Sequence, residues 1–192
     1  IGRKLIGKQL AKDYLEDKRI FLFHEPHYSI EPMLRKACLY MGFKSENIIF
    51  SGQKYSFKDL ETVDYIYVTE GNTFEVLALL RERELIPVIR KAFENGATYI
   101  GASAGAMIAG VSIEEALSFD RNFVRMDDFE GLKLFNGIVI PHYTKKELNQ
   151  YIKNSPGIKE KYNSIYNVPN DEILIIEKWE IGNIENVRKK YH

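Results

Sequence analysis

The chain alternates between two patterns of apolar residues along most of its length. Short apolar runs, typical of strands buried on both faces, lie between longer segments whose apolar residues recur every three or four positions, as on one face of a helix. The strand pattern covers residues 19–23, 47–50, 64–69, 97–101 and 137–140, and residues 172–181 alternate as in a terminal strand or hairpin. The helical pattern covers residues 3–17, 29–42, 73–84, 86–94, 104–117 and 145–154.

This alternation predicts an α/β fold, a three-layer α/β/α sandwich in which helices cover both faces of a mostly parallel sheet. The 192 residues, of which 45% are hydrophobic, are enough for one well-buried core, so we expect one domain over residues 1–192. The chain begins at Ile1 rather than Met, which is consistent with an N-terminal strand preceding it.

Charge and cysteine content exclude several classes of function. The 27 Lys and Arg residues balance the 27 Asp and Glu residues, so no broad electrostatic field is available to bind nucleic acid or an anionic membrane. The single cysteine, Cys38, excludes a disulfide within the chain, and its helical setting predicts a buried thiol rather than a catalytic one. No apolar run is long enough to span a membrane and no signal peptide opens the chain, so we expect a cytoplasmic protein.

The most informative segment is Gly101-Ala-Ser103-Ala-Gly105, which follows a predicted strand and opens a predicted helix. Small residues around a serine allow the sharp strand-to-helix turn that exposes a nucleophilic hydroxyl. A serine hydroxyl is a weak nucleophile at neutral pH and needs a base within hydrogen-bond reach. His142, which follows Pro141 at the end of another predicted strand, is the best candidate for that base. The alternative is a histidine that only packs at the end of its strand.

Other polar segments follow predicted strands and converge on the same sheet edge, where open parallel sheets place their sites. We expect the oxyanion donors to be the amides of Gly71 and Ala104, since a glycine permits close approach and Ala104 begins a helix. The candidates for contacting a substrate are Asn72, Thr73, His24 and Tyr143.

An acid should orient the histidine, and Asp120 gives the order Ser, Asp, His along the chain. Its competitors are expected to be surface charges: Glu114, Glu115, Asp127 and Asp128. The pair His24-x-x-His27 could suggest a metal, but without a third ligand at a telling spacing we favour histidines of a pocket or surface. The sequence contains no phosphate-binding loop and no dinucleotide fingerprint.

From about residue 60 to residue 180 the chain resembles the peptidase E family of aspartyl dipeptidases and their relatives. Three segments carry the resemblance, in this order: Gly71-Asn72-Thr73-Phe74, Gly101-Ala-Ser103-Ala-Gly105-Ala and Pro141-His142-Tyr143-Thr144. The separation of 39 residues between Ser103 and His142 is also typical of the family. The resemblance implies a flavodoxin-like fold similar to that of class I glutamine amidotransferase domains, a serine-peptidase mechanism through an acyl-enzyme, and no metal or other cofactor. It further implies Ser103 as nucleophile, His142 as general base and acid, Asp120 as the acid and Gly71 and Ala104 as the oxyanion hole. A homodimer is an expectation at family level only.

Two departures from the family pattern affect the predicted specificity. Family members usually have a run of glycines before the Asn-Thr pair, whereas this chain has Thr69-Glu70-Gly71, which places a carboxylate beside the proposed oxyanion hole. Aspartyl dipeptidases also carry an arginine after the catalytic histidine, but residues 145–157 contain lysines and no arginine. Lysine lacks the planar fork that binds a carboxylate bidentately. The resemblance therefore does not carry aspartyl specificity over to this chain.

The leading hypothesis is a serine peptidase that hydrolyses short peptides, as a dipeptidase or aminopeptidase does. An esterase-type acyl hydrolase would use the same residues and would be separated by comparing ester and amide substrates. A non-catalytic member of the fold that binds a small ligand or partner would leave Ser103 unreactive toward a fluorophosphonate.

Overall fold

The computed structural model of the chain describes residues 14–26, 30–178 and 185–190. The predicted helix over residues 3–17 lies outside these ranges except for its last four residues, which form no helix. Leu15, within those four, is buried against the core.

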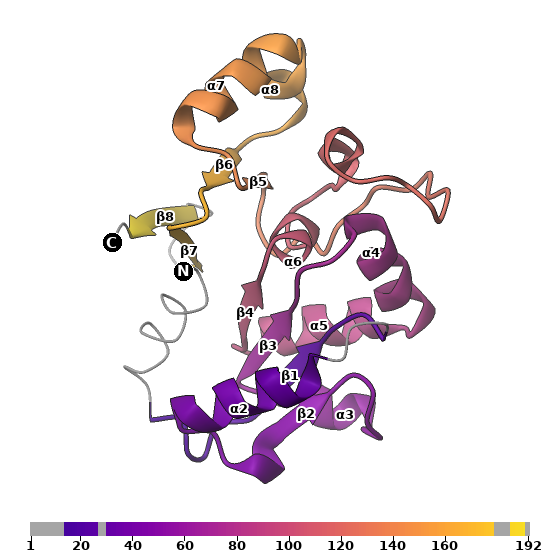
Figure 1. Cartoon of the computed structure of the whole chain (residues 1–192), viewed down its shortest axis with the longest axis vertical. Helices are drawn as coiled ribbons and strands as arrows, with labels where there is room; N and C mark the ends of the chain where they lie inside the picture. The colour runs from indigo at the N-terminus through magenta and orange to yellow at the C-terminus, as the bar shows by residue number, and fades with distance from the viewer. Residues whose placement is uncertain (1–13, 27–29, 179–184, 191–192) are drawn as a thin grey trace.

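Four short parallel strands form the central sheet, in the order β2-β1-β3-β4 (Figure 1). They are β1 (Ile20–Phe23), β2 (Ile48–Phe50), β3 (Tyr65–Val68) and β4 (Thr98–Gly101). Every residue of β1 and β3 is buried, as expected of strands covered on both faces. The first four predicted strands are therefore confirmed.

Helices cover both faces of this sheet, which confirms the predicted three-layer α/β fold (Figure 1). Helix α2 (Glu31–Met41) packs through Leu34 and Cys38 against the face that carries Ile20 and Leu22. On the opposite face, alternate residues such as Phe21 and Val68 contact α3 (Phe57–Leu60), α4 (Thr73–Glu82) and α5 (Leu85–Glu94). A turn of 3-10 helix, η1 (Ser45–Asn47), precedes β2.

The Cys38 thiol lies inside this core, as predicted. The residue is 2% exposed, and burial raises the pKa of its thiol to about 11. At neutral pH the group is therefore a protonated thiol and not a nucleophilic thiolate.

The C-terminal part of the chain forms two further pairs of strands. The predicted strand at 137–140 is β5 (Ile138–Pro141), which pairs in parallel with β6 (Ile165–Val168) in a separate two-stranded sheet. Helices α7 (Lys145–Asn154) and α8 (Ile158–Lys161) lie between them in sequence and above them in Figure 1. The segment 172–181, predicted as a terminal strand or hairpin, contains β7 (Ile173–Lys178), which pairs antiparallel with β8 (Glu185–Lys190) further along the chain.

The helix that follows Ser103 is shorter than predicted. The pattern predicts a helix over 104–117, whereas α6 (Ala104–Ile108) ends early and a 3-10 helix, η2 (Glu114–Ser118), follows. The carbonyls of Ile108, Ala109 and Gly110 accept hydrogen bonds from the backbone amides of residues 132–134 instead of continuing the helix. Small residues in this stretch allow two backbones to meet, so tertiary contacts override the helical pattern.

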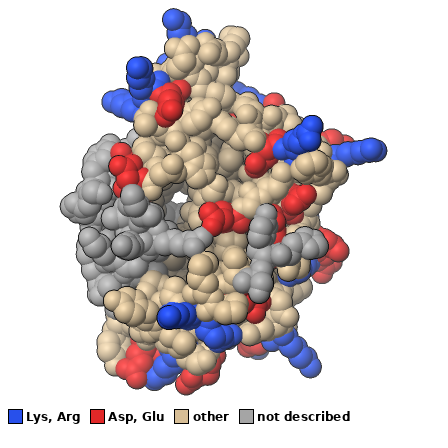
Figure 2. Space-filling model, in the orientation of Figure 1, with Lys and Arg blue, Asp and Glu red and all other residues tan. Residues whose placement is uncertain are grey.

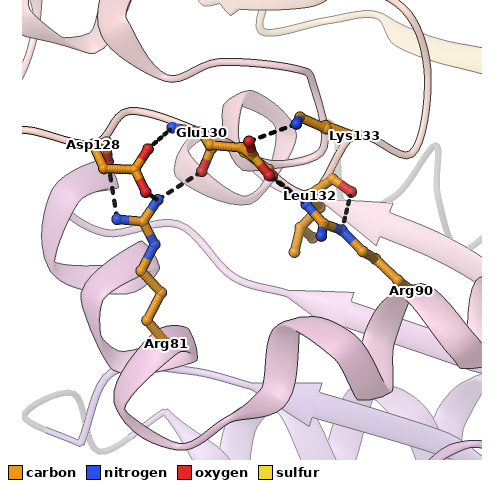
Figure 3. A network of polar contacts seen from close by, with 7 residues as sticks. Arg81, Arg90, Asp128, Glu130, Leu132 and Lys133 are labelled. Atoms are coloured by element: carbon orange, nitrogen blue, oxygen red, sulfur yellow. Dashed lines mark hydrogen bonds and ion pairs between the residues drawn. The ribbon is translucent and has the colours of Figure 1, made fainter.

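The long segment between η2 and β5 is held to the central sheet's helices by two arginines (Figure 3). Arg81 of α4 donates to the carbonyls of Asp128 and Glu130 at 2.9 and 3.0 Å. Arg90 of α5 donates to the Leu132 carbonyl at 2.8 Å and to the Glu130 carboxylate at 3.1 Å. These contacts satisfy carbonyls of a segment that has little regular structure of its own.

On the face seen in Figure 2, Lys and Arg side chains lie interspersed with Asp and Glu side chains. No large area of one sign is present there, in keeping with the balanced composition. Within the described ranges, no helix is both long and apolar enough to cross a membrane.

Candidate active site

Ser103 lies at the sharp turn between β4 and α6, in a strained backbone conformation. Its φ of 50° and ψ of −107° fall outside the regions that L-residues ordinarily adopt. Such a backbone conformation lowers the stability of the folded protein by about 1–3 kcal/mol. Strain of this kind is typical of a nucleophile held on a strand-to-helix elbow. The predicted elbow is therefore present in the structure.

Both glycines of the Gly-x-Ser-x-Gly segment are required by close backbone packing. A Cβ added to Gly105 would lie 2.2 Å from the carbonyl oxygen of Val68, and one added to Gly101 would lie 2.5 Å from the carbonyl oxygen of Gly105. The Tyr99 hydroxyl donates to that same Gly105 carbonyl at 2.7 Å. Burial raises the pKa of Tyr99, so the hydroxyl keeps the proton that it donates. The elbow is thus packed tightly against β3.

His142 reaches the serine from the end of β5. Its Nε2 lies 2.8 Å from Ser103 Oγ, within hydrogen-bond distance. The His142 backbone adopts a positive φ of 68°, and its N–H donates to the Val168 carbonyl of the neighbouring strand at 2.8 Å. This turn directs the imidazole back toward Ser103, so the structure brings together the predicted nucleophile and base.

The group at the other nitrogen of His142 is Asn170, which differs from the prediction. Asn170 Oδ1 lies 2.6 Å from His142 Nδ1, and it follows β6 through Pro169. An amide oxygen accepts the Nδ1–H proton, and this tautomer leaves Nε2 free to accept the serine proton. A Ser-His-Asn arrangement results, analogous to the Cys-His-Asn site of papain-like proteases.

Asp120, predicted as the orienting acid, contacts a different part of the site. Its Oδ2 accepts hydrogen bonds from the Thr73 backbone N–H at 2.9 Å and from the Thr73 hydroxyl at 2.6 Å. Thr73 is the first residue of α4, whose N–H has no partner within the helix. The carboxylate therefore satisfies a helix N-terminus rather than the histidine.

The loop after β3 is fixed in place by backbone hydrogen bonds to the elbow and by its own polar side chains. The Ala102 N–H donates to the Val68 carbonyl at 3.0 Å, which joins the elbow to the start of this loop. Asn72 Oδ1 accepts from the N–H groups of Phe74 and Glu75 as an N-cap, and Asn72 Nδ2 donates to the Arg121 carbonyl at 2.9 Å. The side chains of Asn72 and Thr73 therefore hold the loop, and their contact with a substrate stays a prediction.

His24, another candidate for a substrate contact, is buried and held by two protein oxygens. The side chain is 6% exposed, its Nδ1 lies 2.8 Å from the Glu25 carbonyl oxygen, and its Nε2 lies 2.9 Å from Glu31 Oε1. Both ring nitrogens are thus within hydrogen-bond distance of protein oxygens. A contact between His24 and a substrate stays a prediction. His27 lies outside the described residues.

Tyr143, beside the proposed base, remains a candidate substrate contact. It is half-buried, and its ring lies 5.3 Å from Phe119 and 5.9 Å from Tyr151 in edge-to-face arrangements. Glu70, the carboxylate predicted beside the proposed oxyanion hole, is exposed. Among the residues whose placement the structure gives, no group of three or more His, Cys, Asp or Glu residues could hold a metal ion.

Comparison with known proteins identifies relatives of this chain. The model of peptidase family S51 matches residues 25–184. An uncharacterized peptidase of Listeria monocytogenes is 32% identical over 123 residues, which are 62% of this chain and 58% of that protein. Peptidase E of a Nostoc species is 30% identical over 151 residues, which are 78% of this chain and 58% of that protein. The chain thus spans less than two thirds of the length of these curated relatives.

A solved structure from Listeria monocytogenes, provisionally assigned as a peptidase E protein, shares the fold. It superposes with a TM-score of 0.69 and covers 99% of this chain and 93% of its own, at 23% sequence identity. This likeness supports the three-layer architecture with its mostly parallel sheet.

Proposed function

Because the chain belongs to peptidase family S51, we propose that it is a serine peptidase that hydrolyses short peptides through an acyl-enzyme. The observation that carries the proposal is the line of hydrogen bonds from Ser103 Oγ through His142 to Asn170, at 2.8 and 2.6 Å. Nucleophile, base and orienting group each follow a different parallel strand, Ser103 after β4 of the central sheet and His142 and Asn170 after β5 and β6 of the two-stranded sheet.

In the proposed mechanism, Ser103 Oγ attacks the substrate carbonyl carbon while His142 Nε2 takes the hydroxyl proton. The amides of Gly71 and Ala104 donate to the oxyanion of the tetrahedral intermediate. His142 then gives the proton to the leaving amine, and water attacks the resulting ester by the same route in reverse. Asn170 keeps the Nδ1–H tautomer throughout, but as a neutral amide it adds no charge to stabilise the imidazolium.

The proposal is tested by a screen of dipeptides and aminoacyl amides, together with labelling by a fluorophosphonate and mass spectrometry of the labelled peptide. We expect hydrolysis of at least one dipeptide and labelling at Ser103. If the protein hydrolysed esters but no amides, the proposed peptidase activity would be wrong and the protein would be an esterase-type acyl hydrolase. An unlabelled Ser103 in folded protein, without any turnover, would indicate a binding protein built on the same fold.

Asn170→Ala is expected to lower kcat by between about 10² and 10⁴-fold, because the imidazole loses the group that fixes its tautomer. Asp120→Ala is measured beside it, and Asn154→Ala at the exposed end of α7 is the control. If Asp120 were the orienting acid, Asn170→Ala would keep wild-type kcat while Asp120→Ala alone lost it.

A further inference from the structure

Glu25 is a buried carboxylate that has no role in the proposed chemistry. It lies directly behind the loop after β3, which carries Gly71 and Asn72. Glu25, two residues after β1, is 4% exposed. Its Oε1 accepts a hydrogen bond from the Asn72 backbone N–H at 3.1 Å. Burying a carboxylate is costly unless its oxygens are hydrogen-bonded, so this residue calls for a specific explanation.

Glu25 is also in contact with Gly71. A Cβ added to Gly71 would lie 2.4 Å from Glu25 Oε1 and 2.8 Å from its Cδ, at a φ of 154° that L side chains rarely adopt. The carboxyl group therefore occupies the space that a side chain at position 71 would need. Glycine is required here by Glu25 as well as by the conformation of the loop.

The backbone that carries Glu25 is itself fixed. His24 Nδ1 donates to the Glu25 carbonyl, while His24 Nε2 is held by Glu31 at the start of α2. The β1 end, α2 and the loop after β3 are thereby joined through the buried His24 and Glu25 and the partly exposed Glu31. Because its backbone is fixed, Glu25 can hold the loop after β3 in one position rather than move with it.

A second carboxylate holds the next amide of the same loop from another direction. Asp120 accepts from the Thr73 N–H, directly after the Asn72 N–H that Glu25 accepts. Consecutive amides are thus bound by carboxylates from two distant segments. Glycine loses more conformational freedom on ordering than any other residue, so a donor on Gly71 needs external support to be preorganised.

We propose that Glu25 is a positioning residue. By accepting the Asn72 N–H and packing against Gly71, it fixes the loop on both sides of the Gly71 Cα, so that the Gly71 N–H of the preceding peptide is set for the oxyanion before substrate arrives. The inference rests on the proposed function, because it assigns Gly71 the donor role. Glu25 itself does not touch the substrate. Its effect is expected on kcat rather than on KM, since a preorganised donor acts on the transition state.

Glu25→Ala, Glu25→Gln and Glu25→Asp test this role, with Asp64→Ala as the matched control. Asp64 accepts the Arg19 N–H at 2.8 Å at the opposite end of the sheet, so its loss also removes a carboxylate–amide contact. We expect Glu25→Ala to lower kcat by about 10- to 100-fold with KM changed less than about threefold. Glu25→Gln keeps an acceptor oxygen and should stay within about threefold of wild-type kcat. Asp64→Ala should lower the melting temperature and leave kcat within about twofold.

A readout independent of turnover is the ¹H–¹⁵N spectrum, in which Glu25→Ala should move the Asn72 amide proton upfield and alter the Gly71 signal. If Glu25→Ala fails to fold, Glu25→Asp supplies the test, with kcat lowered about tenfold because the shorter side chain withdraws its oxygen. A Glu25→Asp or Glu25→Ala protein with wild-type kcat and an unshifted Asn72 amide overturns the proposal. Absence of any turnover by wild-type protein would instead refute the proposed function, while the amide shift would still decide whether Glu25 anchors the loop.

Discussion

Ser103→Ala is expected to lower kcat for peptide hydrolysis by at least about 10⁴-fold, because it removes the hydroxyl that forms the acyl-enzyme in the proposed mechanism. The hydroxyl makes the 2.8 Å contact with His142 and has no role as an N-cap of α6. Alanine also carries the same backbone strain as serine at this turn, so the free energy of unfolding should barely change. Steady-state kinetics on the best dipeptide of the screen and thermal unfolding measure the two effects.

The control for this variant is Ser45→Ala, since Ser45 is exposed in the 3-10 helix before β2, remote from the ends of β4 and β5. Ser45→Ala should retain the wild-type kcat and react with the fluorophosphonate to the same extent as the wild-type protein. Hydrolysis that persists in Ser103→Ala at the wild-type rate would eliminate the acyl-enzyme mechanism.

His142→Gly is expected to lower kcat by a comparable factor, about 10⁴-fold, because Ser103 then has no base. Glycine accepts the φ of 68° at this position without strain and leaves room beside the serine for a free imidazole molecule. Added imidazole should therefore restore part of the activity, in proportion to its unprotonated fraction. Kinetics at several imidazole concentrations and pH values measure the rescue.

Imidazole rescue should be absent in Ser103→Ala, which lacks the nucleophile, and this pairing separates a missing base from a damaged fold. If His142 only packed at the end of β5, the glycine variant would lose stability but would keep its reaction with the fluorophosphonate.

The central sheet, the elbow and the serine–histidine pair could be predicted from sequence because each depends on local pattern. The apolar runs of β1 and β3 are buried on both faces, which leaves a continuous signal in the chain. The glycines around Ser103 and the Pro141-His142 turn are likewise local features. The expected meeting of Ser103 and His142 occurs, but across two sheets, since β4 belongs to the four-stranded sheet and β5 to the separate β5-β6 pair.

Asn170 could not be assigned because β6 is a short strand whose tyrosine and asparagine interrupt the apolar pattern. The signal that was available is the Pro169-Asn170-Asp171 turn directly after it, which resembles the other polar strand ends. Asp120 was the wrong choice for the contact with His142, because chain order does not reveal which buried amide needs an acceptor. Here the Thr73 N–H at the start of α4 takes the carboxylate.

His24 and Glu25 show a related limit of sequence reasoning. A histidine at a strand end is compatible with a substrate contact and with a buried network, and only the packing of α2 distinguishes them. The same packing places Glu25 behind Gly71, a relation between residues 46 positions apart that no local pattern contains.

The positive φ at both Ser103 and His142 affects which substitutions would stabilise this protein. Glycine at 103, and glycine or asparagine at 142, would relax the backbone and make the protein more stable. A lineage under selection for folding alone would therefore be expected to lose these two side chains early. The serine and histidine side chains at these two positions therefore stand at a cost in stability, which the proposed catalytic role would explain.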